Sequence, residues 1–205
     1  MTVHLHEEDL PEGVLGPGAV AVDTETMGLQ LGRDRLCVVQ ISDGSGDEHL
    51  VRFAKGSAYD APRLKAVLSD PARLKLYHFA RFDLASIYAY LGVMAAPAYC
   101  TKTASRLIRT YTDRHGLKDL VKEVLGQEIS KQQQSSDWGA SELSDAQKDY
   151  AAADVRYLHA LKEKLDLRLE REGRTQLAQA CFDFLPHRAL LDLAGWAEQD
   201  IFAHV

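Results

Sequence analysis

The sequence predicts an α/β fold in which a mixed sheet is flanked by helices and the C-terminal half is helical. Three observations support this class. First, three β-branched or alternating segments, 19–25, 35–42 and 48–53, are separated by turn residues. Second, strand and helix patterns alternate between residues 61 and 92. Third, only helical periodicity is found from Thr101 onward.

The first half of the chain is expected to supply the sheet. The three early segments follow a polar lead-in that ends at Gly18, and their short connections suit antiparallel pairing. A shorter strand is expected over 74–78 and would add to the sheet in parallel. Helices are expected over 61–68 and 82–91, the second ended by Gly92.

The second half is expected to be built from helices alone. The helical segments are 102–109, 117–125 and one long helix from 145 to about 172. Ser144 and Gln147 form a capping box at the start of the long helix. Gly126 and Gly173 stand where helices end.

The composition is typical of one folded domain. The 205 residues are 46% hydrophobic and 26% charged, which excludes a disordered or fibrous chain. We expect a single domain over 1–205, with a core of about 18–170 and a C-terminal helical extension over 174–205. No apolar stretch reaches about 18 residues and the N-terminus lacks a signal-peptide layout, which predicts a cytoplasmic protein with no membrane contact.

The net charge of −6 argues against a protein that holds long nucleic acids by electrostatic attraction alone. A short nucleic acid is less affected by this argument. The stretch 102–118 is nevertheless basic, and it is either a solvated helix face or a surface that faces phosphate. Cys37, Cys100 and Cys181 are widely spaced, which fits neither a disulfide framework nor a zinc site.

Two carboxylates interrupt the first apolar strand. Asp23 and Glu25 are two residues apart, so on a strand their side chains point to the same face. Desolvation and mutual repulsion both disfavour such a pair unless a cation holds it. Mg²⁺ or Mn²⁺ takes oxygen ligands, and two such ions about 3.5–4 Å apart can flank one phosphate. The alternative is that Asp23 ends the strand and Glu25 begins a polar turn.

Three further residues complete a candidate catalytic set. Tyr150 and Asp154 are four residues apart, so on a helix they share one face and reach the same site. Asp83 is expected in the first turn of the helix that follows the strand at 74–78. Each residue also has a structural alternative: a half-buried Tyr150, a surface Asp154, and an Asp83 stabilised by the helix dipole.

The order of these motifs resembles a known family. Asp-x-Glu-x-x-Gly-Leu, His-x-x-x-Phe-Asp and Tyr-Ala-x-x-Asp-Val begin at Asp23, His78 and Tyr150 and are similar to the motifs of DEDDy 3′-to-5′ exonucleases of the ribonuclease D superfamily. The resemblance implies a ribonuclease H-like fold. It further implies that Asp23, Glu25, Asp83 and Asp154 bind two divalent ions while Tyr150 positions the attacking water. Many family members have Asn where this chain has Phe79.

Segments 109–118, 129–138 and 180–186 resemble the nanoRNase C family, whose members cleave very short oligoribonucleotides, notably dinucleotides. The resemblance implies an exoribonuclease that releases nucleoside 5′-monophosphates and a homo-oligomer, an octamer. The aromatic C-terminal segment also favours an oligomer, because a free tail would expose it. A ribonuclease D-like enzyme for longer RNA, or for DNA, is the alternative, and a silent nucleic-acid-binding module is a third hypothesis.

Substrate-binding residues are expected in three places. The turn after the metal pair contributes Thr26, Met27, Gly28 and Leu29, where Gly28 would let the backbone approach a terminal ribose. The resemblance to short-RNA nucleases implies that Leu29 wedges against the terminal bases, unless it is a core anchor. The second motif contributes His78, Arg81 and Phe82, with Arg81 able to neutralise a phosphate and His78 also suited to a structural hydrogen bond. The polar stretch 131–136, including Gln134 and Ser135, either caps a 5′ phosphate or is a solvated linker.

Overall fold

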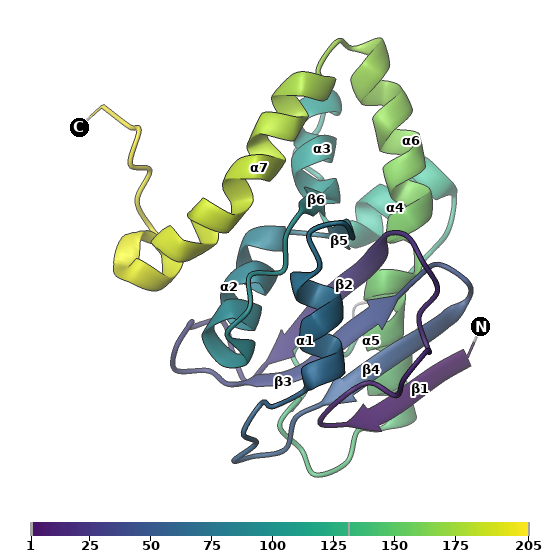
Figure 1. Cartoon of the computed structure of the whole chain (residues 1–205). Coiled ribbons are helices and arrows are strands. Elements are labelled where there is room, and N and C mark those ends of the chain that lie inside the picture. Colours follow the sequence, from purple (N-terminus) through teal and green to yellow (C-terminus); the bar gives the residue numbers. More distant parts are fainter. Residues whose placement is uncertain (1, 131, 205) are drawn as a thin grey trace.

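The computed structural model describes residues 2–130 and 132–204 and contains a six-stranded mixed sheet. The sheet order is β1-β4-β3-β2-β5-β6 (Figure 1). The strands are β1 (Thr2–Glu7), β2 (Val20–Thr26), β3 (Leu36–Ser42), β4 (Asp47–Arg52), β5 (Lys75–Tyr77) and β6 (Ala98–Cys100). β2, β3 and β4 pair antiparallel, whereas β1, β5 and β6 join in parallel. The predicted mixed sheet is therefore confirmed.

Two of these strands were not predicted from the sequence. β1 falls in the segment expected to be a polar lead-in, and it pairs in parallel with β4 at the edge of the sheet. Its residues are only partly buried, so its apolar pattern is weak. β6 has three residues, too few for a periodic pattern to be recognised.

The helices lie on both faces of the sheet and extend beyond one end of it. In Figure 1, α1 and α2 cover the front face and α5 covers the back. The helices are α1 (Pro62–Ser69), α2 (Ala80–Leu91), α3 (Thr101–Ile108), α4 (Leu117–Leu125), α5 (Asp145–Arg156), α6 (Leu158–Arg171) and α7 (Thr175–Leu191), followed by the π-helical turn η1 (Asp192–Trp196). No described helix is both long and apolar enough to cross a membrane.

The single long helix expected from 145 to about 172 is wrong, because the chain turns at Tyr157 between α5 and α6. Tyr157 has φ −102° and ψ −3°, outside the regular helical values. α5 packs across the sheet, whereas α6 packs against α3 and α4, so the two helices have different packing partners. The predicted capping box at the start of α5 is confirmed: the Ser144 hydroxyl accepts from the Gln147 backbone N–H at 3.3 Å, and the Gln147 side chain accepts from the Ser144 N–H at 3.0 Å.

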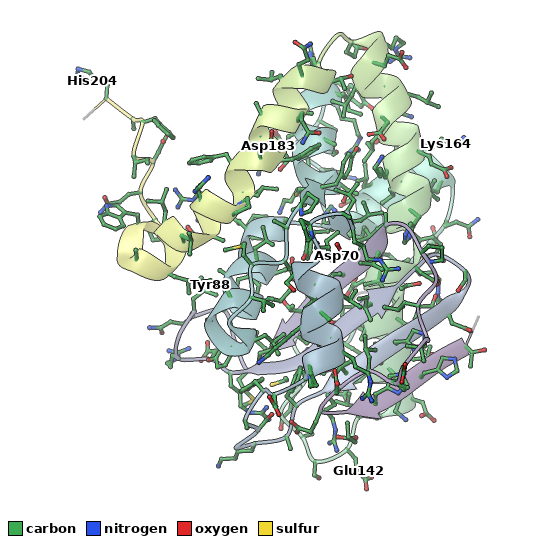
Figure 2. The ribbon with its side chains drawn as sticks, in the orientation of Figure 1. Asp70, Tyr88, Glu142, Lys164, Asp183 and His204 are labelled. Carbon is green, nitrogen blue, oxygen red and sulfur yellow. The ribbon has the colours of Figure 1, made fainter. Side chains whose placement is uncertain are left out.

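The C-terminal helix α7 packs against α2 and α3 through a face that includes Phe182 and Leu185. Beyond η1 the tail projects from the body of the molecule (Figures 1 and 2), but it keeps contacts with α7: the Phe202 ring packs against Phe184, and Arg188 donates to the Gln199 carbonyl at 3.3 Å. Trp196, Ile201 and Phe202 on this segment are exposed.

Candidate active site

The site begins at the C-terminal end of β2, which pairs antiparallel with β3 on one side and parallel with β5 on the other. Asp23 lies opposite Gln40 of β3 and Glu25 lies opposite Val38, so both carboxylates leave the same face of the sheet. The register then shifts between Glu25 and Thr26. Such an irregularity bends a strand and often lies beside a functional site, where it redirects the chain.

Helix α5 brings Asp154 to the two carboxylates of β2. One oxygen each of Asp23, Glu25 and Asp154 lie within 4.8 Å of one another. α5 packs directly against β2 and β3, which places its Asp154 face over the strand end. Residues 131 positions apart in the sequence thus meet in one acidic cluster, as the motif order predicted.

Asp83 enters the site from the first turn of α2, as predicted. It is only 3% exposed, and its Oδ1 accepts a hydrogen bond from the Thr24 hydroxyl at 2.7 Å. Thr24 stands between Asp23 and Glu25 on β2, so this bond joins α2 to the strand that carries the other acids.

Three carboxylates of the cluster, those of Asp23, Glu25 and Asp83, have a raised pKa. Burial is the largest cause for Asp23 and Glu25, followed by the negative charges of the neighbouring acids. Burial also raises the pKa of Asp83 to about 7, although hydrogen bonds from Thr24 oppose the shift. Ionisation is disfavoured because the charges are both desolvated and close together. These groups therefore favour a cation that would hold them in the ionised form.

The donor set fits a hard divalent cation. All four side chains offer carboxylate oxygens, the ligands that Mg²⁺ and Mn²⁺ prefer, and three of the oxygens already converge. The Gln40 amide donates to Asp23 Oδ2 at 3.4 Å, a weak contact that does little to neutralise the cluster. Asp23, Glu25, Asp83 and Asp154 are therefore the residues that could hold a metal.

Tyr150 lies one turn before Asp154 on α5. Burial raises the pKa of its phenol, and the negative charges of Asp154, Glu25 and Asp23 raise it further. The hydroxyl therefore stays protonated at neutral pH and can donate a hydrogen bond in the site. The Trp138 ring packs against the Tyr150 ring, with the two ring centroids 6.0 Å apart.

The acidic cluster lies in a cleft with a volume of about 680 Å³. All five predicted catalytic residues line it. So do most of the predicted substrate-binding residues: Thr26, Met27, Gly28, Leu29, His78, Phe82, Gln134 and Ser135. Lys131, which belongs to the same predicted polar stretch, lies outside the described residues.

The exposure of Leu29 decides between its two interpretations. The side chain is 84% exposed and lines the cleft, so it is not a core anchor. A Cβ at Gly28 would collide with the Asp34 carboxylate, so a larger residue there would require Asp34 to move. His78 keeps both of its predicted properties: it lines the cleft, and its Nδ1 lies 2.8 Å from the Thr101 hydroxyl.

Arg81 is placed differently from the prediction. Its guanidinium donates to both carboxylate oxygens of Asp192, at 2.7 and 2.6 Å, and to the Ala197 carbonyl at 3.0 Å. It is not among the described residues that line the cleft. On a helix, positions two apart point roughly 200° away from each other, so Arg81 cannot share the direction of Asp83. Arg81 holds the C-terminal segment.

Several cleft residues were not predicted as site residues from the sequence. They are Thr24, Phe79, Lys102, Gly116, Leu117, Lys118, Ile129, Ser130 and Trp138. The basic stretch 102–118 had pointed to two of these residues, Lys102 and Lys118. The cations of this stretch have different surroundings in the structure. Lys102 and Lys118 line the cleft, whereas Arg109 is buried and bonded to Glu123.

Comparisons with known proteins agree with this geometry. Residues 6–170 match the protein family described as 3′-5′ exonuclease. The ribonuclease D of Acidiphilium cryptum is 37% identical over 155 residues, which are 76% of this chain and 39% of that protein. The chain thus spans about two fifths of the length of that relative.

Two solved structures match over their whole length. Brucella melitensis NrnC bound to pGG is 55% identical with a TM-score of 0.97, and Brucella melitensis NrnC with bound Mg²⁺ is 54% identical with a TM-score of 0.95. Each match covers 100% of both chains. The fold and the acidic cleft therefore define a ribonuclease D-like nuclease with a ribonuclease H-like sheet. The chain belongs to the 3′-5′ exonuclease family, and within it groups with the NrnC nucleases.

Proposed function

We propose that this protein is a metal-dependent 3′-to-5′ exoribonuclease that hydrolyses dinucleotides and other very short RNA to nucleoside 5′-monophosphates. The observation that carries the proposal is the convergence of Asp23, Glu25, Asp83, Asp154 and Tyr150 in one cleft. The pGG bound by Brucella NrnC supports the substrate class. We expect this activity in the cytoplasm.

Asp23, Glu25, Asp83 and Asp154 would hold two divalent ions, Mg²⁺ or Mn²⁺, in the DEDDy arrangement. The bound ions would supply an activated water and stabilise the departing oxygen. Tyr150 would orient the attacking water through its O–H group.

The remaining walls of the cleft would bind the substrate. Leu29 and Met27 present exposed apolar side chains suited to base contacts that tolerate any sequence. Gln134 and Ser135 offer polar groups for a terminal phosphate. The cleft's volume of about 680 Å³ would accommodate a very short nucleic acid.

A homo-oligomer, which we propose to be an octamer of single-domain subunits, would cover the exposed apolar groups of the C-terminal segment. Trp196, Ile201 and Phe202 are exposed on the C-terminal segment, although the Phe202 ring also packs against Phe184 of α7, with the ring centroids 6.0 Å apart. Contiguous exposed apolar groups of this kind mark protein interfaces. The molar mass in solution, measured by light scattering, tests this proposal.

The experiment for the activity is turnover of end-labelled RNA from two to seven nucleotides long. The dinucleotide should be hydrolysed fastest, to nucleoside 5′-monophosphates, and excess chelator should stop the reaction. Asp83→Ala should lose about a hundredfold or more of the rate, since even residues that only orient ligands contribute 10- to 100-fold. Loss of hydrolysis in this variant would also exclude a silent binding module.

The second candidate is a ribonuclease D-like exonuclease that trims longer RNA or degrades DNA with the same five residues. The similarity to ribonuclease D favours it. Equal rates at every RNA length, or a preference for the longest, would support this candidate over the first.

A further inference from the structure

Phe79 occupies a position where the local backbone disfavours phenylalanine. It links β5 to α2 with φ 78° and ψ 44°, the left-handed region that glycine and asparagine adopt most readily. It is also the N-cap of α2, where residues with a side-chain oxygen are preferred, and it makes no side-chain cap hydrogen bond. Neither the left-handed backbone nor the N-cap position explains why an aromatic residue stands here.

Burial does not explain the ring either. Phe79 is 42% exposed and lines the cleft, whereas its neighbours Tyr77 and Ala80 are fully buried. A bulky residue kept in a disfavoured conformation beside an active site indicates a functional reason.

The ring is held in place from one side. The Lys102 ammonium lies 4.3 Å from the ring centroid, which is within the range of a cation–π interaction. The adjacent pair His78 and Thr101 are 2.8 Å apart, so α3 is fastened to this turn at two successive positions. Phe79 also lines the cleft and is partly exposed, so a second flat partner can reach the ring from the cleft.

The position of the ring relative to the acids is fixed by α2. Phe79 immediately precedes the helix, and Asp83 lies in the first turn of the same helix. Leu29 and Met27 line the same cleft and are exposed.

We propose that Phe79 is a stacking platform for one nucleobase of the substrate, with Lys102 supporting the ring from behind. The inference rests on the proposed function and adds a base-binding residue to it. Aromatic stacking contacts any base, so it would serve an enzyme that must accept every short sequence. A ring that only packs against Lys102 is the structural alternative.

The test combines a protein variant with a substrate variant. Phe79→Asn removes the ring and suits the left-handed backbone, so the variant should melt at the wild-type temperature or above it. Its KM for a dinucleotide should rise about five- to hundredfold, the range expected for one lost stacking contact, with a smaller change in kcat. Phe79→Trp should keep KM near the wild-type value.

Two dinucleotides that each lack one base complete a double-mutant cycle. With one of them, the KM of the wild type and of Phe79→Asn should become equal, because the stacking partner is already gone. Equal effects of Phe79→Asn on the intact and both abasic dinucleotides would overturn the inference.

Tyr88→Asn is the matched control. Tyr88 is 41% exposed on the same helix and is labelled in Figure 2, but it is not among the described residues of the cleft. This variant should leave KM unchanged for every substrate. Failure of the wild type to hydrolyse dinucleotides would instead count against the proposed function, so the two failures are distinguishable.

Discussion

The hydroxyl of Thr24 donates a hydrogen bond to Oδ1 of Asp83 across 2.7 Å, and this bond joins strand β2 to helix α2 inside the acidic cluster. Thr24 has no charge and offers no metal-binding carboxylate. It nevertheless fixes the direction of one carboxylate relative to two others, because Asp23 and Glu25 flank it on the strand. Changing a group that orients a metal ligand typically costs about 10- to 100-fold in metal affinity or activity.

Thr24→Val tests this positioning role. Valine has nearly the shape of threonine, so packing is kept while a buried carboxylate loses a donor. We expect about a 10- to 100-fold loss of Mg²⁺ affinity or of kcat. Thr24→Ser restores the hydroxyl and should recover most of the loss. Equal activity in the valine and serine variants would contradict the role.

Mg²⁺ should stabilise the folded protein. Burial and the neighbouring negative charges raise the pKa of Asp23 and Glu25 when no cation is bound, so an ion that binds only the folded state relieves this strain. At 100 times its Kd, one ion adds about 2.7 kcal/mol to the free energy of unfolding. Thermal melting with Mg²⁺ and with chelator measures the difference.

The matched variant for this measurement is Asp154→Asn. It removes one converging carboxylate and keeps its shape, so the rise in melting temperature with Mg²⁺ should be much smaller. An undiminished rise would place the stabilising ion elsewhere.

The parts of the fold that could be predicted depend on short-range patterns. β2, β3 and β4 carry apolar runs between turns, and Tyr150 and Asp154 share a helix face because of their spacing. Asp23 and Glu25 are likewise related by the two-residue period of a strand. In each case the geometry is set by residues that are close to one another in the sequence.

The parts that could not be predicted depend on distant partners. β1 is a strand because β4 pairs with it, and α5 ends at Tyr157 because the following helix packs against different neighbours. The guanidinium of Arg81 donates to Asp192, which lies 111 residues further along the chain. A local pattern contains no information about such partners.

Arg81→Ala should therefore weaken the fold and leave substrate binding almost unchanged. Asp192 is buried and accepts from both Arg81 and Arg188, so removing one donor leaves it poorly compensated. We expect a loss of about 1–3 kcal/mol of stability and faster proteolysis of the C-terminal segment. KM for a dinucleotide should change less than twofold.

Arg171→Ala is the control for that change. Arg171 pairs with Glu172 on the surface, where an ion pair contributes about 0–1 kcal/mol, so the variant should melt like the wild type. A large rise in KM in Arg81→Ala, without loss of stability, would restore the phosphate-binding role that the sequence suggested.

Three stacked histidines should make the edge of the sheet sensitive to acid. His4 and His6 of β1 stack against His49 of β4, and His6 Nε2 lies 2.9 Å from His49 Nδ1. Burial and the neighbouring histidines lower the pKa of His6 and of His49, although Asp43, Asp47 and Glu48 oppose the shift of His49. The unfolded chain therefore binds more protons than the folded one between the lowered values and the ordinary value of 6.5.

The free energy of unfolding should consequently fall as the pH decreases below about 6.5, and β1 should lose its amide protection first. His6→Phe keeps a flat ring on β1 and removes one titrating group, so its stability should fall less steeply between pH 7 and pH 5. His204→Phe, on the exposed tail, should follow the wild-type curve. Urea unfolding at several pH values measures all three proteins, and identical slopes for His6→Phe and the wild type would show that the stack does not control this loss.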